Sequence, residues 1–79
     1  MRQFDEKKFS LTREVKEIFE ELKAQGREPE FQQKFWQTPQ GVLVRGRLHY
    51  QKVEPVKVSL EKRPGDYMEN IYIHVRKIQ

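Results

Sequence analysis

Cationic and aromatic side chains recur at alternate positions in the second half of this 79-residue chain. Alternate residues of a β-strand point to the same face of a sheet, so strands through these positions would gather them on one surface. Lys and Arg neutralise phosphate groups, while Tyr and His rings stack on unpaired bases. The sequence therefore predicts a small protein that binds single-stranded RNA or DNA. The predicted contact residues are Arg45, Arg47, His49, Lys57, Tyr72, His74 and Arg76.

The positive charge is unevenly distributed along the chain. Sixteen Lys and Arg against twelve Asp and Glu give a net charge of +4. Residues 1–40 hold eight basic and eight acidic side chains, whereas residues 41–79 hold eight basic and four acidic ones. An anionic partner is therefore expected on the second half of the chain.

A protein partner is the alternative to a nucleic acid. Trp36, flanked by Lys34 and Gln37, is interpreted either as a core residue or as a stacking platform or partner anchor. The rival hypothesis is a protein–protein interaction module, such as a small inhibitor or accessory factor of a nucleic-acid enzyme. It would use Trp36, an open strand edge and the charged face of a helix.

A metal-free ribonuclease is a lesser alternative. His49 or His74 could act as general acid or base, with arginines stabilising the charge on the phosphate. Nothing in the spacing brings the two histidines to a common phosphate, so we predict no catalytic residue and expect that the protein is not an enzyme.

Composition excludes several other classes. The chain has no Cys and only two His, too few for a structural zinc site, so no metal or cofactor is expected. No apolar stretch is long enough for a signal peptide or a membrane span, which predicts a cytoplasmic protein. The small core expected of so short a chain leaves a homo-oligomer open.

Hydrophobic periodicity divides residues 1–79, read as one domain, into a helix and a sheet. Leu11, Val15, Ile18, Phe19 and Leu22 form one stripe of an amphipathic helix over residues 11–25. Residues 1–9 are ambiguous between a flexible arm and a short extra strand. From residue 30 to residue 78 the pattern favours a period of two. Strands are predicted at 30–37, 41–52, 56–62 and 69–78, separated by turns that contain proline.

The predicted fold class is α+β, with one N-terminal amphipathic helix followed by a curved four-stranded antiparallel meander. Gly46, in the middle of the second predicted strand, favours a strong bend, so that the sheet could close into a small barrel of the Sm or SH3 type. The buried face of the sheet is predicted to consist of Val42, Val44, Leu48, Tyr50, Val56, Val58, Leu60, Ile71, Ile73 and Val75.

Two short motifs carry a resemblance to a known family. The segment 41–48, GVLVRGRL, and the late Tyr72-Ile-His74 follow an N-terminal helix. In this order they resemble the Sm-like RNA chaperones of bacteria. The resemblance implies a ring-forming, RNA-binding protein in which Tyr72 and His74 contribute to the RNA pocket.

Overall fold

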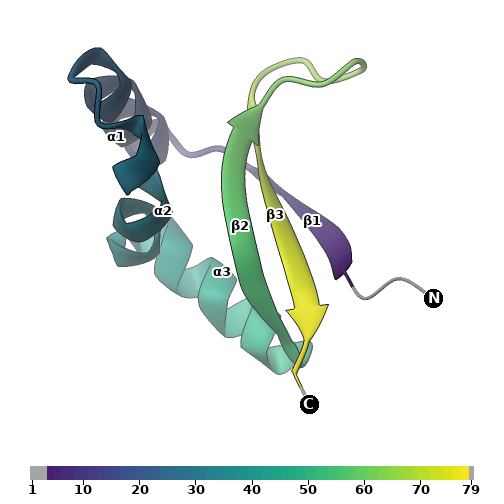
Figure 1. Cartoon of the computed structure of the whole chain (residues 1–79). Coiled ribbons are helices and arrows are strands. Elements are labelled where there is room, and N and C mark those ends of the chain that lie inside the picture. The colour runs from purple at the N-terminus through teal and green to yellow at the C-terminus, as the bar shows by residue number, and fades with distance from the viewer. Residues whose placement is uncertain (1–3, 79) are drawn as a thin grey trace.

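A computed structural model describes residues 4–78 as an open sheet with helices on one face (Figure 1). Strand β1 (Phe4–Ser10) comes first and helix α1 (Arg13–Ala24) follows it. A broken helical segment contains η1 (Glu28–Glu30), α2 (Phe31–Lys34) and η2 (Phe35–Gln37), and it leads into α3 (Pro39–Tyr50). Strands β2 (Val53–Glu61) and β3 (Asn70–Lys77) complete the chain. Among these elements no helix is long and apolar enough to cross a membrane.

The predicted N-terminal helix is confirmed as α1. Thr12 is its N-cap, where the side-chain oxygen accepts a hydrogen bond from the Val15 backbone N–H at 3.3 Å. Val15 and Leu22 of the predicted stripe are buried. The chain leaves the helix through Gly26, whose φ of 70° lies in the left-handed region that favours glycine. The ambiguous N-terminal segment forms β1 from residue 4 onward, and residues 1–3 lie outside the described part of the chain.

The predicted strands at 30–37 and 41–52 are wrong, because both segments are helical. Phe31, Phe35, Thr38, Val44 and Leu48 are buried, and these positions recur every three or four residues rather than every two. The side chain of Thr38 accepts from the Gly41 backbone N–H at 3.0 Å, and Pro39 occupies the first turn, which together start α3. Two residues predicted to be buried by the strand pattern are exposed in α3, namely Val42 and Tyr50.

The sheet has three antiparallel strands in the order β1-β3-β2, not four strands in a meander. Ile71, Ile73 and Val75 of the central strand β3 are buried, as predicted, and so is Val58 of β2. Val56 was predicted on the same face but is 49% exposed. The register shifts between Pro55 and Lys57, which makes Val56 the extra residue of a bulge.

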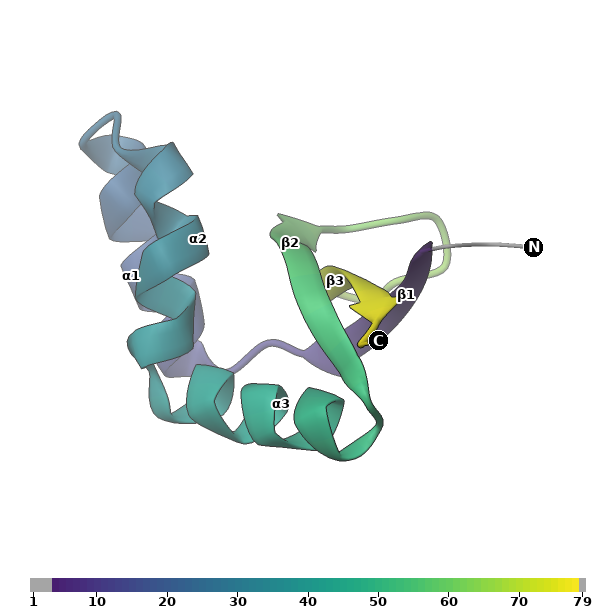
Figure 2. The same cartoon turned by 60° about the horizontal axis from the view of Figure 1, so that its bottom comes forward.

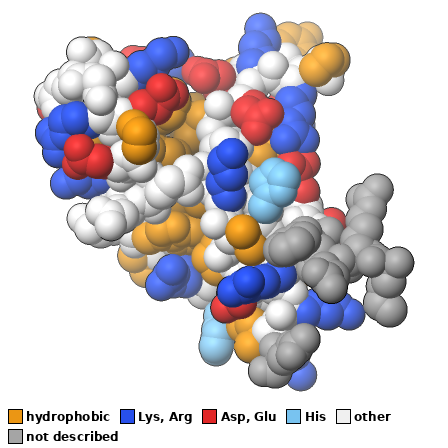
Figure 3. Space-filling model, in the orientation of Figure 1, with side chains coloured by type: hydrophobic (Ala, Val, Ile, Leu, Met, Phe, Trp, Pro, Cys, Tyr) orange, Lys and Arg blue, Asp and Glu red, His pale blue; other side chains and the backbone are white. Residues whose placement is uncertain are grey.

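The sheet does not close into a barrel, so the fold expected from the Sm-like resemblance is wrong. Its segment 41–48 belongs to helix α3 rather than to a strand. Figure 2 shows α3 running across one side of the sheet while α1 and α2 stand beside it. The core lies in the angle between these helices and the inner face of β3. Figure 3 shows apolar side chains gathered in the hollow between the helical layer and the sheet, with basic and acidic side chains intermixed around them.

Two glutamine side chains tie the helical layer to the two outer strands. The amide oxygen of Gln32 accepts from the Val58 N–H at 2.9 Å, and its amide nitrogen donates to the Val58 carbonyl. Gln40 does the same at the end of β1, donating to the Ser10 carbonyl and accepting from the Thr12 N–H. Each amide therefore satisfies backbone groups that would otherwise need a neighbouring strand as their hydrogen-bond partner.

Gly41 and Gly46 of the same helix should respond to alanine in opposite directions. A Cβ on Gly41 would lie 1.9 Å from the Phe35 carbonyl oxygen, whereas a Cβ on Gly46 would meet no atom within 4 Å. We expect Gly41→Ala to lower the free energy of unfolding by about 2 kcal/mol or more, because the backbone must move apart. Gly46→Ala should raise it by about 0.5–1 kcal/mol, because alanine favours the helix.

Urea unfolding followed by circular dichroism measures both changes in free energy. Equal effects of the two substitutions would contradict the close approach of Gly41 to Phe35.

Candidate nucleic-acid interface

The predicted contact residues lie on two separate surfaces. Arg45, Arg47 and His49 are on α3 and not on a strand, so their placement on a sheet face is wrong. The other four lie on the sheet face that points away from the helices: Lys57, Tyr72, His74 and Arg76. The two histidines consequently lie on different layers of the molecule, and the structure does not join them in one site.

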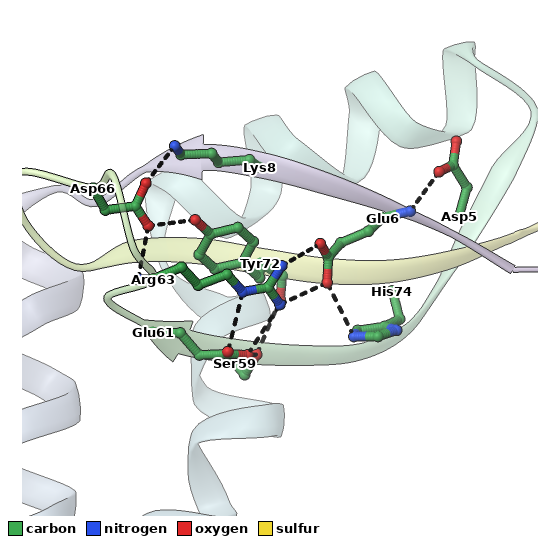
Figure 4. A network of polar contacts seen from close by, with 9 residues as sticks. All are labelled: Asp5, Glu6, Lys8, Ser59, Glu61, Arg63, Asp66, Tyr72 and His74. Atoms are coloured by element: carbon green, nitrogen blue, oxygen red, sulfur yellow. Dashed lines mark hydrogen bonds and ion pairs between the residues drawn. The ribbon is translucent and has the colours of Figure 1, made fainter.

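Tyr72 on this outer sheet face is covered and is not available for stacking. Its side chain is only 5% exposed, and the Arg63 guanidinium lies 3.8 Å from the centroid of its ring. The Tyr72 hydroxyl donates to Asp66, whose carboxylate also accepts from Lys8 at 2.7 Å (Figure 4). The ring predicted to bind a base is thus part of the protein's own packing.

Acidic residues pair with Lys8, Arg63 and Arg76 on the outer sheet face, whereas Lys57 forms no ion pair among the described residues. The Arg63 guanidinium donates to both oxygens of Glu6, at 2.6 and 2.8 Å, and to Glu61 at 3.2 Å. Glu6 also lies 3.3 Å from His74. Arg76 is ion-paired with Glu54. Figure 4 shows that this network joins β1, β3, the end of β2 and the loop after it, so these charges are paired within the protein.

The pKa shifts in this network favour ionised carboxylates and a protonated Tyr72 hydroxyl. Hydrogen bonds from Lys8, from the Tyr72 hydroxyl and from the Arg63 backbone N–H hold the pKa of Asp66 far below its ordinary value. The Asp66 carboxylate in turn raises the pKa of Tyr72. The Arg63 hydrogen bonds lower the pKa of Glu6. At neutral pH the Asp66 and Glu6 carboxylates are therefore ionised beside the Lys8 and Arg63 cations, while the Tyr72 hydroxyl keeps its proton.

A second group of cations lies on α3 and the turn that follows it. No Asp or Glu occurs from residue 31 to residue 53. We define the α3 surface as the basic and aromatic residues of this stretch that are exposed at or beyond the middle of the helix. They are Arg45, Arg47, His49, Tyr50 and Lys52. Within the described part of the chain, the three Lys and Arg side chains of this surface form no ion pair.

The two ends of the α3 surface are held in place differently. The guanidinium of Arg45 lies 5.0 Å from the centroid of the Trp36 ring, which fixes one flank by a cation–π contact. This places Trp36 half-buried beside Phe35, and not as an exposed stacking platform. Lys52 has a φ of 61°, and its carbonyl accepts from the Ile78 N–H at 3.0 Å. The turn after α3 therefore lies against the end of β3 (Figure 1).

Tyr50 is the ring on the α3 surface that a ligand could reach. Its side chain is 88% exposed, and it lies three residues after Arg47, on the same side of the helix. Next to Arg47, a groove of about 670 Å³ runs between α3 and the end of β1. Phe9, Pro39 and Leu43 supply apolar atoms to this groove. The α3 surface thus combines cations with an exposed ring and an apolar margin.

Sequence reasoning missed Tyr50 and Lys52 as site residues because the strand pattern placed Tyr50 in the core. The signal that could have found them is the capping sequence Thr38-Pro39, which is typical of a helix start, followed by a long stretch without acidic residues. The described residues contain no cluster of three metal-ligating side chains.

Comparison with known proteins adds no relative. No protein-family model matches this chain, and neither a curated protein nor a solved structure shows significant similarity to it.

The lowered pKa of Asp66 predicts how stability depends on pH. The unfolded chain binds a proton at Asp66 near the ordinary pKa of about 3.9, whereas the folded protein does so only at lower pH. Stability from this group is therefore complete above about pH 4 and is lost as the pH falls through the folded pKa. Asp66→Asn should lower the melting temperature at pH 7. As the pH falls into the acid range, the melting temperature of this variant should decrease less than that of the wild-type protein.

Thermal unfolding at a series of pH values tests this expectation. The matched control is Glu17→Gln on the exposed face of α1, which removes a carboxylate that forms no ion pair among residues 4–78. If the melting temperature of Asp66→Asn falls as steeply in acid as that of the control, the proposed role of the Asp66 contacts is contradicted.

Proposed function

We propose that this protein binds single-stranded RNA or DNA through the α3 surface. The observation that carries the proposal is the separation of charge: the α3 cations form no ion pair among the described residues, whereas on the outer sheet face Lys8, Arg63 and Arg76 are ion-paired and Lys57 alone is not. This keeps the predicted class of ligand and moves its site from the sheet to a helix. The proposed location of the protein remains the cytoplasm.

The cations of the α3 surface match the chemistry of a phosphate backbone. Arg45, Arg47 and Lys52 are exposed and carry three positive charges within eight residues. Neutralising about three phosphates of a single strand would make log affinity fall with log salt at a slope of about −2. A helix that carries basic residues and no carboxylate of its own also contributes a local field that attracts polyanions.

The exposed Tyr50 favours a single strand over a duplex. Base stacking on an aromatic ring contributes about 1–3 kcal/mol and requires an unpaired base. Tyr50 replaces Tyr72 in this role because Tyr72 is buried under Arg63. His49 lies on the same helix and is exposed, so it can add a hydrogen bond or a second ring.

A protein partner is the second candidate, favoured by the apolar groove beside α3. Leu43 is 75% exposed and lines the groove together with Phe9 and Pro39. An apolar side chain of a partner, next to an acidic one facing Arg47, would fit this arrangement.

Neutral substitutions on the two surfaces distinguish the proposed site from the one first predicted. Arg47→Gln with Lys52→Gln should weaken binding about tenfold near 0.1 M salt and reduce the salt slope by about 1.4, since two phosphate contacts are lost. Lys57→Gln with Arg76→Gln removes the same charge from the outer sheet face and should leave affinity nearly unchanged. Fluorescence anisotropy with labelled single-stranded RNA, single-stranded DNA and duplex DNA measures both.

Tyr50→Ala should weaken single-strand binding more than duplex binding. If the sheet variant loses affinity and the α3 variant does not, the site is on the sheet. If the wild-type protein binds none of the three nucleic acids at about 50 mM salt, where electrostatic binding is strong, the proposal fails and the groove beside Leu43 becomes the leading site.

A further inference from the structure

The two edges of the sheet are protected to very different extents. On the β2 edge, the Gln32 amide occupies both the N–H and the carbonyl of Val58. Pro55 has no N–H, and the bulge at Val56 interrupts the regular pattern next to it. These are the features by which proteins prevent a further strand from pairing with an edge. The β2 edge is therefore closed.

The register shows which backbone groups of β1 point away from the sheet. The N–H and carbonyl of Val58 point away from β3, so those of its opposite residue Ile73 point toward β1. Lys7, opposite Ile73 on the other side, therefore exchanges both hydrogen bonds with it. Bonding alternates along an antiparallel pair, so the groups of Glu6, Lys8 and Ser10 point to the outer edge of β1.

Side-chain contacts agree with this assignment and show how little covers the edge. The Ser10 carbonyl is bonded to the Gln40 amide, and the Glu6 N–H donates to the side chain of Asp5 at 2.8 Å. Among residues 4–78, no other strand pairs with this edge. From Phe4 to Lys8, the outward backbone groups of β1 are therefore open to a further strand, except that the Glu6 N–H must exchange its contact with Asp5 for a bond to that strand.

We propose that β1 pairs in antiparallel fashion with β1 of a second copy of this chain, about a two-fold axis that passes between the two Glu6 residues. A two-fold axis normal to the sheet keeps each side chain on its own face, so residues of the same face must lie opposite one another. In this register Asp5 of each copy faces Lys7 of the other. The dimer thus contains two opposite-charge pairs across its axis, each worth about 0.2–1 kcal/mol.

The same geometry excludes the neighbouring register, in which the two-fold axis passes between the two Lys7 residues. That register would place Phe4 of one copy opposite Ser10 of the other, whose carbonyl already accepts from Gln40. It would also place the two Lys7 side chains opposite one another. With the axis at Glu6, two Glu6 side chains face each other on the outer sheet face. Each of them already accepts two hydrogen bonds from Arg63, at 2.6 and 2.8 Å, which offsets their repulsion.

The dimer would have a six-stranded continuous sheet with the helices of both copies on one side. The two α3 surfaces would then lie on the same side of the assembly, where one nucleic-acid strand could reach both. The pairing itself rests only on the edge of β1 and does not depend on the proposed function.

Sedimentation equilibrium of the wild-type protein without nucleic acid, over a wide range of concentration, tests the proposal. We expect a reversible dimer. Asp5→Lys places lysines opposite one another at both pairs and should raise the dimer dissociation constant about tenfold or more. Asp5→Lys with Lys7→Asp exchanges the charges and should restore dimerisation. Glu17→Lys on α1 changes the net charge equally and should have no effect.

A wild-type protein that is monomeric throughout overturns the proposal, and it would mean that the charges of β1 serve to keep other strands away. A dimer that Asp5→Lys does not weaken overturns pairing through β1. Failure of the exchanged double variant to restore the dimer, although circular dichroism shows it folded, overturns the register. None of these outcomes bears on the α3 surface, because the experiment contains no nucleic acid and leaves α3 unchanged.

Discussion

The architecture depends on the sharp corner at Thr38, where the short helices end and α3 begins. The Thr38 hydroxyl donates to the Phe35 carbonyl at 2.6 Å and accepts from the Gly41 N–H at 3.0 Å, and the side chain is 4% exposed. The Phe35 carbonyl also accepts from the Thr38 backbone N–H at 3.1 Å, but the buried Gly41 N–H, in the first turn of α3, would be left without a partner, which is costly. Only glycine at position 41 lets the two backbones come this close. The corner turns α3 across the sheet, so that Val44 and Leu48 join the core beside Ile73.

The same arrangement separates the chemistry of the molecule into two parts. The helical layer covers the apolar face of β3, and the opposite face is left to charged residues. There Arg63 and Asp66, from the loop after β2, bind Glu6, Lys8 and Tyr72, so that long-range ion pairs replace a second apolar layer. Side chains used in this way are not available to a ligand. The cations of α3 are exposed and form no such pairs among the described residues, which is why we propose the interface on a helix.

A three-stranded sheet in a small chain has two edges and little core with which to protect them. The glutamines of the helical layer act on these edges unequally. Gln32 bonds both groups of Val58 in the middle of β2, whereas Gln40 bonds only the end of β1 at Ser10. The unequal protection follows from the position of these two glutamines, since Gln32 of α2 lies at the middle of β2, whereas Gln40 of α3 reaches β1 only at its end. The helical layer thus decides which edge can accept another strand.

The sequence alone was sufficient to predict α1 and the buried face of β3. The stripe from Val15 to Leu22 fits only the period of a helix, and the alternation of Ile71, Ile73 and Val75 fits only the period of a strand. Between residues 31 and 50 the sequence was not sufficient to predict the secondary structure. Val42, Val44, Leu48 and Tyr50 satisfy a period of two, while Gly41, Val44 and Leu48 satisfy a helix, so the spacing of apolar residues alone could not choose between strand and helix. The tertiary structure decided through the packing of Val44 and Leu48 against β3, which is distant in the sequence, and through the close approach of the Gly41 and Phe35 backbones at the corner. The exposure of Tyr72 likewise could not be predicted from the sequence. The outward direction of its side chain was predicted correctly. Its burial, however, depends on Arg63 and Asp66, which reach the ring only when the loop after β2 folds back over the sheet.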